Sequence, residues 1–72
     1  MDEVFQQALG KRIKSLRLER TSLSQEKFAY QAGIDRTYYA SIEQGKHAPT
    51  INLLRKIASS LGLTLSELLE GL

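Results

Sequence analysis

Apolar residues recur at spacings of three and four along most of the chain, which is the pattern of helices that bury one face. The first such segment, Glu3–Arg20, places five apolar residues on one face: Phe5, Ala8, Leu9, Ile13 and Leu16. The same spacing predicts further helices at residues 25–32, 36–44, 51–61 and 65–70. No segment shows the sustained alternation of apolar and polar residues that marks a strand. The pattern therefore predicts an all-α fold, a compact five-helix bundle, since helices this short are unstable alone.

Helix boundaries are indicated by the residues that flank these segments. Polar side chains that can accept hydrogen bonds from a first helical turn precede four of them: Ser24, Asp35, Thr50 and Thr64. Thr64 also lies three residues before Glu67, which predicts a capping box. Glycines, which end many helices, follow the last four segments: Gly33, Gly45, Gly62 and Gly71. Start and stop signals thus agree with the apolar pattern.

The second and third predicted helices are joined by a tight turn. Ala29 is small where another helix must cross closely, and Gly33 can adopt the positive φ of a sharp turn. Ile34 adds an apolar side chain that holds the turn against the core. A helix, a short turn containing glycine and a second helix form the helix-turn-helix unit, here expected at about residues 24–44.

The second helix of this unit has two unlike faces. Tyr39 and Ile42 lie three residues apart and are expected to face the core. The other face carries short or donor-rich side chains: Arg36, Thr37, Ala40, Ser41 and Gln44. Arginine can grip a guanine edge, threonine can contact a base, and alanine allows close approach. A solvated helix face more often carries Glu and Lys four residues apart, so this face favours DNA reading.

Charge is unevenly distributed along the chain. All ten Lys and Arg lie within residues 4–56, which contain only four acids, whereas residues 57–72 contain two acids and no base. A basic body with a neutral-to-acidic end is typical of a protein with a polyanion on one face and another partner at one end. Charge alone fits an ordinary solvated surface equally well.

Composition excludes several function classes. With no cysteine and one histidine, the 72-residue chain offers neither a thiolate metal site nor an acid–base constellation. We therefore expect no enzyme activity, no metal, no cofactor and no small-molecule ligand. No apolar run approaches the roughly 18 residues that cross a bilayer, and the start Met1-Asp2-Glu3 is unlike a secretory signal. A single cytoplasmic domain spanning residues 1–72 is expected.

Several runs resemble the phage Cro/repressor-type (XRE-like) helix-turn-helix family. They are SQEKFA, AGI, YYASIEQGK and PTINLLRKIASSLGLTLSELL, and the resemblance covers about Leu9–Leu69. The shorter run DRTYYASIE is similar to the controller proteins of restriction–modification systems. Two features depart from the family pattern. The link LERTSLSQ is one residue longer than usual, and Tyr39 stands where Ile or Val is usual, so its hydroxyl needs a partner.

The resemblance implies which residues would meet DNA. The base-reading positions are Arg36, Thr37, Ala40 and Ser41. The backbone-contacting positions are Gln25, Tyr38, Gln44, Lys46, His47 and Asn52. For Arg36 the alternatives are a phosphate contact or pairing with Asp35 or Glu26. Tyr38 fits a phosphate contact and a role in covering the core equally well. Arg17 and Glu43 match a family pair, and we expect a semi-buried ion pair that sets the angle of the reading helix.

The last segment, residues 62–72, is rich in leucine. It holds five leucines in eleven positions, too many for a short helix to bury. We expect Leu68 in the core and Leu65, Leu69 and Leu72 in a homodimer interface, which the resemblance also implies. A two-fold dimer places two reading helices about one DNA turn apart, on a palindromic operator.

The combined interpretation is a sequence-specific, dimeric DNA-binding transcription regulator, of the kind that controls a restriction–modification system. Two alternatives remain. One is an antitoxin-type autoregulator with a toxin partner, and the other is a protein-bridging module that uses the same fold without reading bases. The sequence names neither the operator nor the regulated gene, and it does not separate activation from repression. It also leaves open whether the chain is part of a larger protein.

Overall fold

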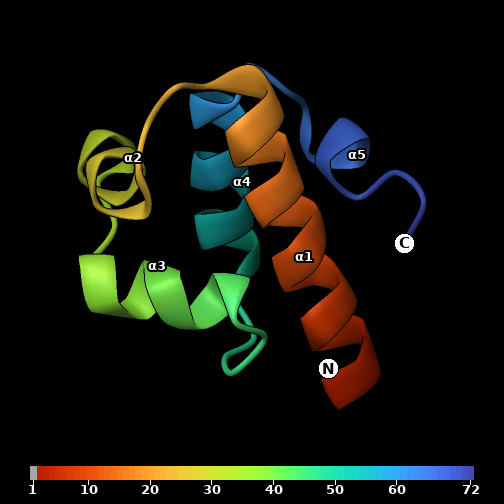
Figure 1. Ribbon diagram of the computed structural model, residues 1–72. Coiled ribbons are helices and arrows are strands. Elements are labelled where there is room, and N and C mark those ends of the chain that lie inside the picture. Colours follow the sequence, from red (N-terminus) through yellow and green to blue (C-terminus); the bar gives the residue numbers. More distant parts are fainter. Residues whose placement is uncertain (1) are drawn as a thin grey trace.

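Five helices make up the computed structural model, which describes residues 2–72 (Figure 1). They are α1 (Glu3–Arg20), α2 (Gln25–Ala32), α3 (Arg36–Glu43), α4 (Ile51–Ser60) and α5 (Leu65–Leu68). In Figure 1, α2 and α3 lie on one side of α1 and α4, and α5 lies on the other side, near the C-terminus. Residues 2–72 contain no strand, which confirms the predicted all-α fold. None of the helices in this part of the chain could cross a bilayer.

Every helix begins at a side-chain cap. The four predicted caps are confirmed, and Asp2 caps α1 in the same way. In α3, for example, the amide of Tyr38 donates to the Asp35 carboxylate at 2.9 Å. The predicted capping box of α5 is also present, since Thr64 and Glu67 exchange hydrogen bonds of 2.8 and 3.1 Å. The longer link before α2 leaves its start at Gln25, where the Ser24 cap predicts it.

Three helices end earlier than the apolar pattern predicts. They end at Glu43, Ser60 and Leu68, whereas the prediction placed the ends at residues 44, 61 and 70. After α3, the amide of Gly45 donates to the carbonyl of Ile42, three residues back, at 3.0 Å. Gly45 then adopts φ 75°, which turns the chain away from the helix axis. The last residue predicted for each of these helices thus lies in a turn closed by hydrogen bonds to the carbonyl three residues back. The spacing of apolar residues does not reveal such a turn.

A single core connects all five helices. Its buried residues include Leu9, Ile13, Leu16, Phe28, Ala29, Ile34, Tyr39, Ile42, Leu54, Ile57, Ala58, Leu61 and Leu68. The rings of Phe28 and Tyr39 pack at a centroid distance of 5.2 Å, which joins α2 to α3 inside the core. Phe5, at the start of α1, only borders the core.

α1 crosses the end of α3 at Gly10. A Cβ atom on Gly10 would lie 2.5 Å from the carbonyl oxygen of Ile42 and 2.6 Å from that of Glu43. Both neighbours are backbone atoms, which cannot rotate away as a side chain would. The missing side chain therefore sets how closely α3 approaches α1.

The turn between α2 and α3 has the predicted geometry. Gly33 adopts φ 73°, and the amide of Ile34 donates to the carbonyl of Ala29 at 2.9 Å. The side chain of Ile34 is buried beneath the turn. Because the turn is anchored to the core, α3 is held with one face inward and one face outward.

Candidate nucleic-acid interface

A buried ion pair ties α1 to α3. Arg17 Nε donates to Glu43 Oε2 at 2.8 Å, and Arg17 Nη2 donates to Glu43 Oε1 at 3.2 Å. The remaining guanidinium nitrogen, Nη1, donates to the carbonyl of Leu23 at 2.9 Å, in the link before α2. Only 6 % of each charged residue is exposed. One guanidinium therefore fixes α1, the start of α2 and the end of α3 relative to one another.

Glu43 accepts two further hydrogen bonds. One comes from the hydroxyl of Tyr39, and the other comes from Gln25 Nε2 at 2.9 Å. Burial by itself would raise the pKa of Glu43, but the hydrogen bonds from Arg17, Tyr39 and Gln25 outweigh it and hold that pKa below its usual value. Burial also raises the pKa of Tyr39, which keeps its hydroxyl a donor. Glu43 is thus an ionised carboxylate whose two oxygens accept four hydrogen bonds, from Arg17, Tyr39 and Gln25.

The two adjacent tyrosines have different surroundings. Tyr39 is fully buried, and its hydroxyl has the partner that its departure from the family pattern requires. Tyr38 is only half-buried, and its ring lies 5.5 Å from the imidazole of His47. Tyr39 therefore belongs to the core, and Tyr38 lies at the surface, beside the loop that follows α3.

The predicted reading face of α3 points away from the core. Arg36, Thr37 and Gln44 are exposed, while Ala40 and Ser41 are half-buried. One shallow groove is lined by residues from the beginnings of α2 and α3: Ser24, Gln25, Glu26, Arg36, Thr37 and Ala40. The structure thus brings three of the predicted base-reading residues together with Gln25, the predicted phosphate contact at the start of α2.

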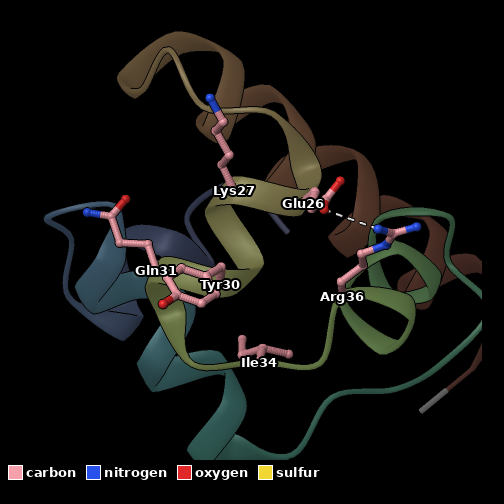
Figure 2. A pocket seen from close by; sticks show the side chains of 6 residues that line it. All are labelled: Glu26, Lys27, Tyr30, Gln31, Ile34 and Arg36. Atoms are coloured by element: carbon pink, nitrogen blue, oxygen red, sulfur yellow. Dashed lines mark ion pairs between the residues drawn. The ribbon is translucent and has the colours of Figure 1, made fainter.

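Arg36 forms an exposed ion pair with Glu26 of α2 (Figure 2). The Nη1–Oε1 distance is 3.1 Å, and both side chains are 67 % exposed. The pair borders a pocket that is lined by Lys27, Tyr30, Gln31 and Ile34 as well. Water screens such a pair strongly, so it holds the guanidinium only weakly and leaves it free to meet another anion.

The remaining predicted contacts do not form one cluster. Lys46 and His47 are exposed in the loop after α3, and His47 contacts Ser41 of the reading helix. Asn52, near the start of α4, is also exposed, but it lines a different groove, together with Arg55 and Lys56. That groove carries two positive charges that the sequence interpretation did not single out, although the adjacent basic residues are a readable signal.

The C-terminal segment separates buried from exposed leucines. Leu68 is fully buried, as predicted, whereas Leu65 and Leu69 are half-buried and Leu72 is 42 % exposed. Arg12 of α1 donates to the carbonyl oxygens of Glu67 and Leu68 at 2.9 and 3.0 Å. These bonds hold α5 against α1, a role for Arg12 that no local pattern indicates.

The family profile described as helix-turn-helix matches residues 13–68. The chain belongs to the helix-turn-helix family. The XRE-like resemblance seen in the sequence is therefore confirmed, and with it the predicted class, a DNA-binding transcription regulator. The proteins similar to it are described as control, repressor and regulator proteins.

Similar proteins include several controllers. The control protein C.MunI of Mycoplasma sp is 52% identical over 63 residues, covering 88% of this chain and 85% of that protein. The control protein C.BamHI of Bacillus amyloliquefaciens is 33% identical over 61 residues, covering 85% of this chain and 75% of that protein. Among solved structures, the restriction-modification controller protein C.AhdI from Aeromonas hydrophila matches with a TM-score of 0.85 and 30% identity, covering 92% of this chain and 94% of that one.

This helix-turn-helix protein differs from its sequence interpretation chiefly in how its parts are linked. Gln25, expected to meet a phosphate, also donates to Glu43, and Ser41, expected to meet a base, also bonds two neighbours. The Gln25–Glu43 bond joins two helices and the His47–Ser41 contact joins a loop to α3, so neither has a signal in local spacing. The Ser41–Tyr38 bond, by contrast, is the local back-bond that a helical serine often makes.

Proposed function

We propose that this protein is a homodimeric, sequence-specific regulator that controls a restriction–modification system by reading a palindromic operator with α3. The observation that carries the proposal is the groove in which Arg36, Thr37 and Ala40 of α3 lie beside Gln25 of α2. The controllers among its relatives support the choice of system. In this proposal one domain, residues 1–72, both reads DNA and forms the dimer. It acts in the cytoplasm on nucleoid DNA.

Base reading depends on α3 entering the major groove. Arg36, at the exposed start of the helix, would reach a guanine edge with two parallel hydrogen bonds, exchanging Glu26 for the base. Thr37 would meet a thymine methyl, and Ala40 would let the helix approach closely. Ser41, one turn beyond Thr37, would meet a base edge farther along the groove.

Backbone contacts would fix the position of α3 on the duplex. Gln25 lies at the N-terminus of α2, where free amides favour a phosphate, and its carboxamide is oriented by Glu43. The other proposed phosphate contacts flank α3 or begin α4: Tyr38, Gln44, Lys46, His47 and Asn52. Each of these side chains is at least partly exposed.

The proposed dimer joins two copies through the C-terminal segment. Leu65, Leu69 and Leu72 give an apolar surface beside the buried Leu68. Two-fold symmetry would pair identical surfaces and set two copies of α3 on successive half-sites, which makes the operator palindromic.

Selection from a random pool of DNA duplexes tests the proposal. The expected result is a palindromic consensus whose affinity falls steeply between low and moderate salt, because binding releases counterions from the phosphates. Binding with no enrichment over random DNA would reject base reading and favour the bridging module. Enrichment only in complex with a second, toxic protein would favour the antitoxin.

A further inference from the structure

His47 is held against α3 by a short chain of hydrogen bonds. The hydroxyl of Ser41 lies 2.6 Å from the carbonyl oxygen of Tyr38, and His47 Nδ1 lies 2.7 Å from the same hydroxyl. The His47 ring also packs against the ring of Tyr38, with centroids 5.5 Å apart. Although His47 is an exposed loop residue, its imidazole is therefore oriented by two residues of the reading helix.

The position of each hydrogen follows from the chemistry of the three groups. The carbonyl of Tyr38 can only accept, so Ser41 must donate its single hydroxyl hydrogen there. Ser41 then has no hydrogen left for His47, so Nδ1 must carry a hydrogen and donate it to the Ser41 oxygen. In the neutral ring, the other nitrogen, Nε2, is consequently a bare acceptor.

A bare acceptor cannot hydrogen-bond a phosphate, whose oxygens also only accept. The protonated ring can, because both of its nitrogens then donate. We propose that Ser41 makes His47 a proton-dependent phosphate-binding residue, so that DNA binding takes up a proton, at most one per protomer. The proton comes from solvent and is added to Nε2, whose N–H then donates to the phosphate. This inference rests on the proposed function, because it requires the loop after α3 to meet the DNA backbone.

No ion pair among residues 2–72 involves His47. Lys46 precedes it in the loop, and the phenol of Tyr38 faces it from α3. α1 reaches this loop through the uncharged Gln6, whose Nε2 donates to the carbonyl of Gly45 at 3.2 Å. The ion pairs in this part of the chain are Arg17–Glu43 and Arg36–Glu26. A DNA phosphate would therefore be the partner that stabilises the imidazolium.

Ser41 becomes a positioning residue in this arrangement. The Ser41 hydroxyl donates its hydrogen bond to the Tyr38 carbonyl, and one of its two lone pairs accepts the hydrogen bond from His47. One lone pair on the Ser41 oxygen therefore stays available. Any base contact by Ser41 is therefore restricted to accepting a hydrogen bond, as from the amino group of adenine or cytosine.

The first test measures the tautomer in the free protein. Nitrogen-15 NMR at a pH where the ring is neutral should show His47 protonated on Nδ1, and Ser41→Ala should shift the ring toward the Nε2-protonated form. Ser41→Thr, which keeps the hydroxyl, should retain the Nδ1 form. A predominantly Nε2-protonated ring in the unaltered protein would overturn the inference.

The second test measures proton uptake on binding DNA. Calorimetric titration with a duplex of random sequence, and with any duplex recovered by selection, is repeated in buffers of different ionisation enthalpy. Binding to DNA should be accompanied by proton uptake of at most one proton per protomer, and affinity should rise as the pH falls toward neutrality. His47→Gln should take up no proton at this site. Ser41→Ala should take up less, because its neutral ring can already donate from Nε2.

The outcomes distinguish this inference from the proposed function. Tight binding without proton uptake, or with the same uptake in His47→Gln, would overturn the inference and leave the regulator intact. Selection that yields no consensus, together with normal proton uptake on random duplexes, would reject sequence-specific regulation and support the phosphate contact. Failure to bind any duplex would overturn both.

Discussion

Arg17 and Glu43 meet through two hydrogen bonds, 2.8 Å between Nε and Oε2 and 3.2 Å between Nη2 and Oε1, across 26 residues of sequence. The pair lies where α1 crosses the end of α3, and both residues are buried. Because Glu43 also receives hydrogen bonds from Tyr39 and Gln25, one carboxylate links the core to the candidate DNA surface. A buried group, rather than an exposed one, therefore holds the end of α3 against α1.

Removing this carboxylate should strongly destabilise the fold. Glu43→Ala leaves Arg17 charged and buried, and it leaves the Tyr39 hydroxyl without its acceptor, so we expect a loss of about 3–5 kcal/mol in the free energy of unfolding. Urea denaturation measures this loss. The matched double variant Arg17→Met with Glu43→Gln removes both charges and keeps an acceptor for Tyr39, and it should lose less. A loss below about 1 kcal/mol for Glu43→Ala would show that water reaches the site.

Acid should weaken the fold through the same residue. The pKa of Glu43 in the folded protein lies below its ordinary value of 4.5, so the unfolded chain takes up the proton first as the pH falls. The contribution of Glu43 is thus complete above about pH 5 and is lost as the pH falls through its lowered pKa, at up to about 1.4 kcal/mol per pH unit. Urea midpoints from pH 6 down to pH 3, compared with those of Glu43→Gln, measure it. If the urea midpoints of the two proteins fell in parallel with pH, Glu43 would not be the source of the acid sensitivity.

Gly10 shows where prediction from sequence succeeded and where it could not. The helices and their caps were readable because each depends on residues within a few positions, as when Asp35 accepts from the Tyr38 amide. Gly10 has no such signal, because the backbone atoms that exclude a side chain there belong to Ile42 and Glu43, more than thirty residues away. The hydrogen bond from Gln25 to Glu43 is hidden for the same reason. Local spacing thus predicts the elements and their faces, whereas cross-helix contacts require the folded chain.

Gly10→Ala should push α3 away from α1. The added Cβ meets two backbone oxygens at 2.5 and 2.6 Å, and overpacking of this kind costs about 1–3 kcal/mol. The better helix propensity of alanine returns only about 1 kcal/mol, so we expect net destabilisation together with weaker DNA binding. Thermal unfolding and DNA titration measure the two effects.

Lys11→Ala, at the exposed neighbouring position, is the control and should change stability by less than about 0.5 kcal/mol. Unchanged stability in Gly10→Ala would mean that α3 moves without cost.

Arg36 and Glu26 should affect DNA binding in opposite directions. Arg36→Ala removes the proposed guanine contact, so affinity should fall by about 1–3 kcal/mol and the selected consensus should relax at one position in each half-site. Glu26→Gln releases Arg36 from an exposed pair and removes a negative charge beside the groove, so affinity should rise while stability changes by less than about 1 kcal/mol. Selection and salt-dependent titration of both variants provide the measurement. A consensus that survives Arg36→Ala at every position would reassign Arg36 to the phosphates.

Leu69→Glu should convert the proposed dimer into monomers. The side chain is half-buried next to the fully buried Leu68, so a charge there would be desolvated in a two-fold interface but could reach solvent in the free protomer. Sedimentation at several concentrations should show the shift, and urea denaturation should confirm that the variant still folds. Tyr30→Glu places the same charge at a residue of α2 that is 89% exposed, and it should leave the sedimentation unchanged. In Figure 1, α2 lies on the opposite side of the molecule from α5. Loss of the dimer should also weaken binding to a palindrome far more than binding to a single half-site, because two linked contacts are released together. Equal sedimentation of Leu69→Glu and the unaltered protein at every concentration would move the interface away from the C-terminal segment.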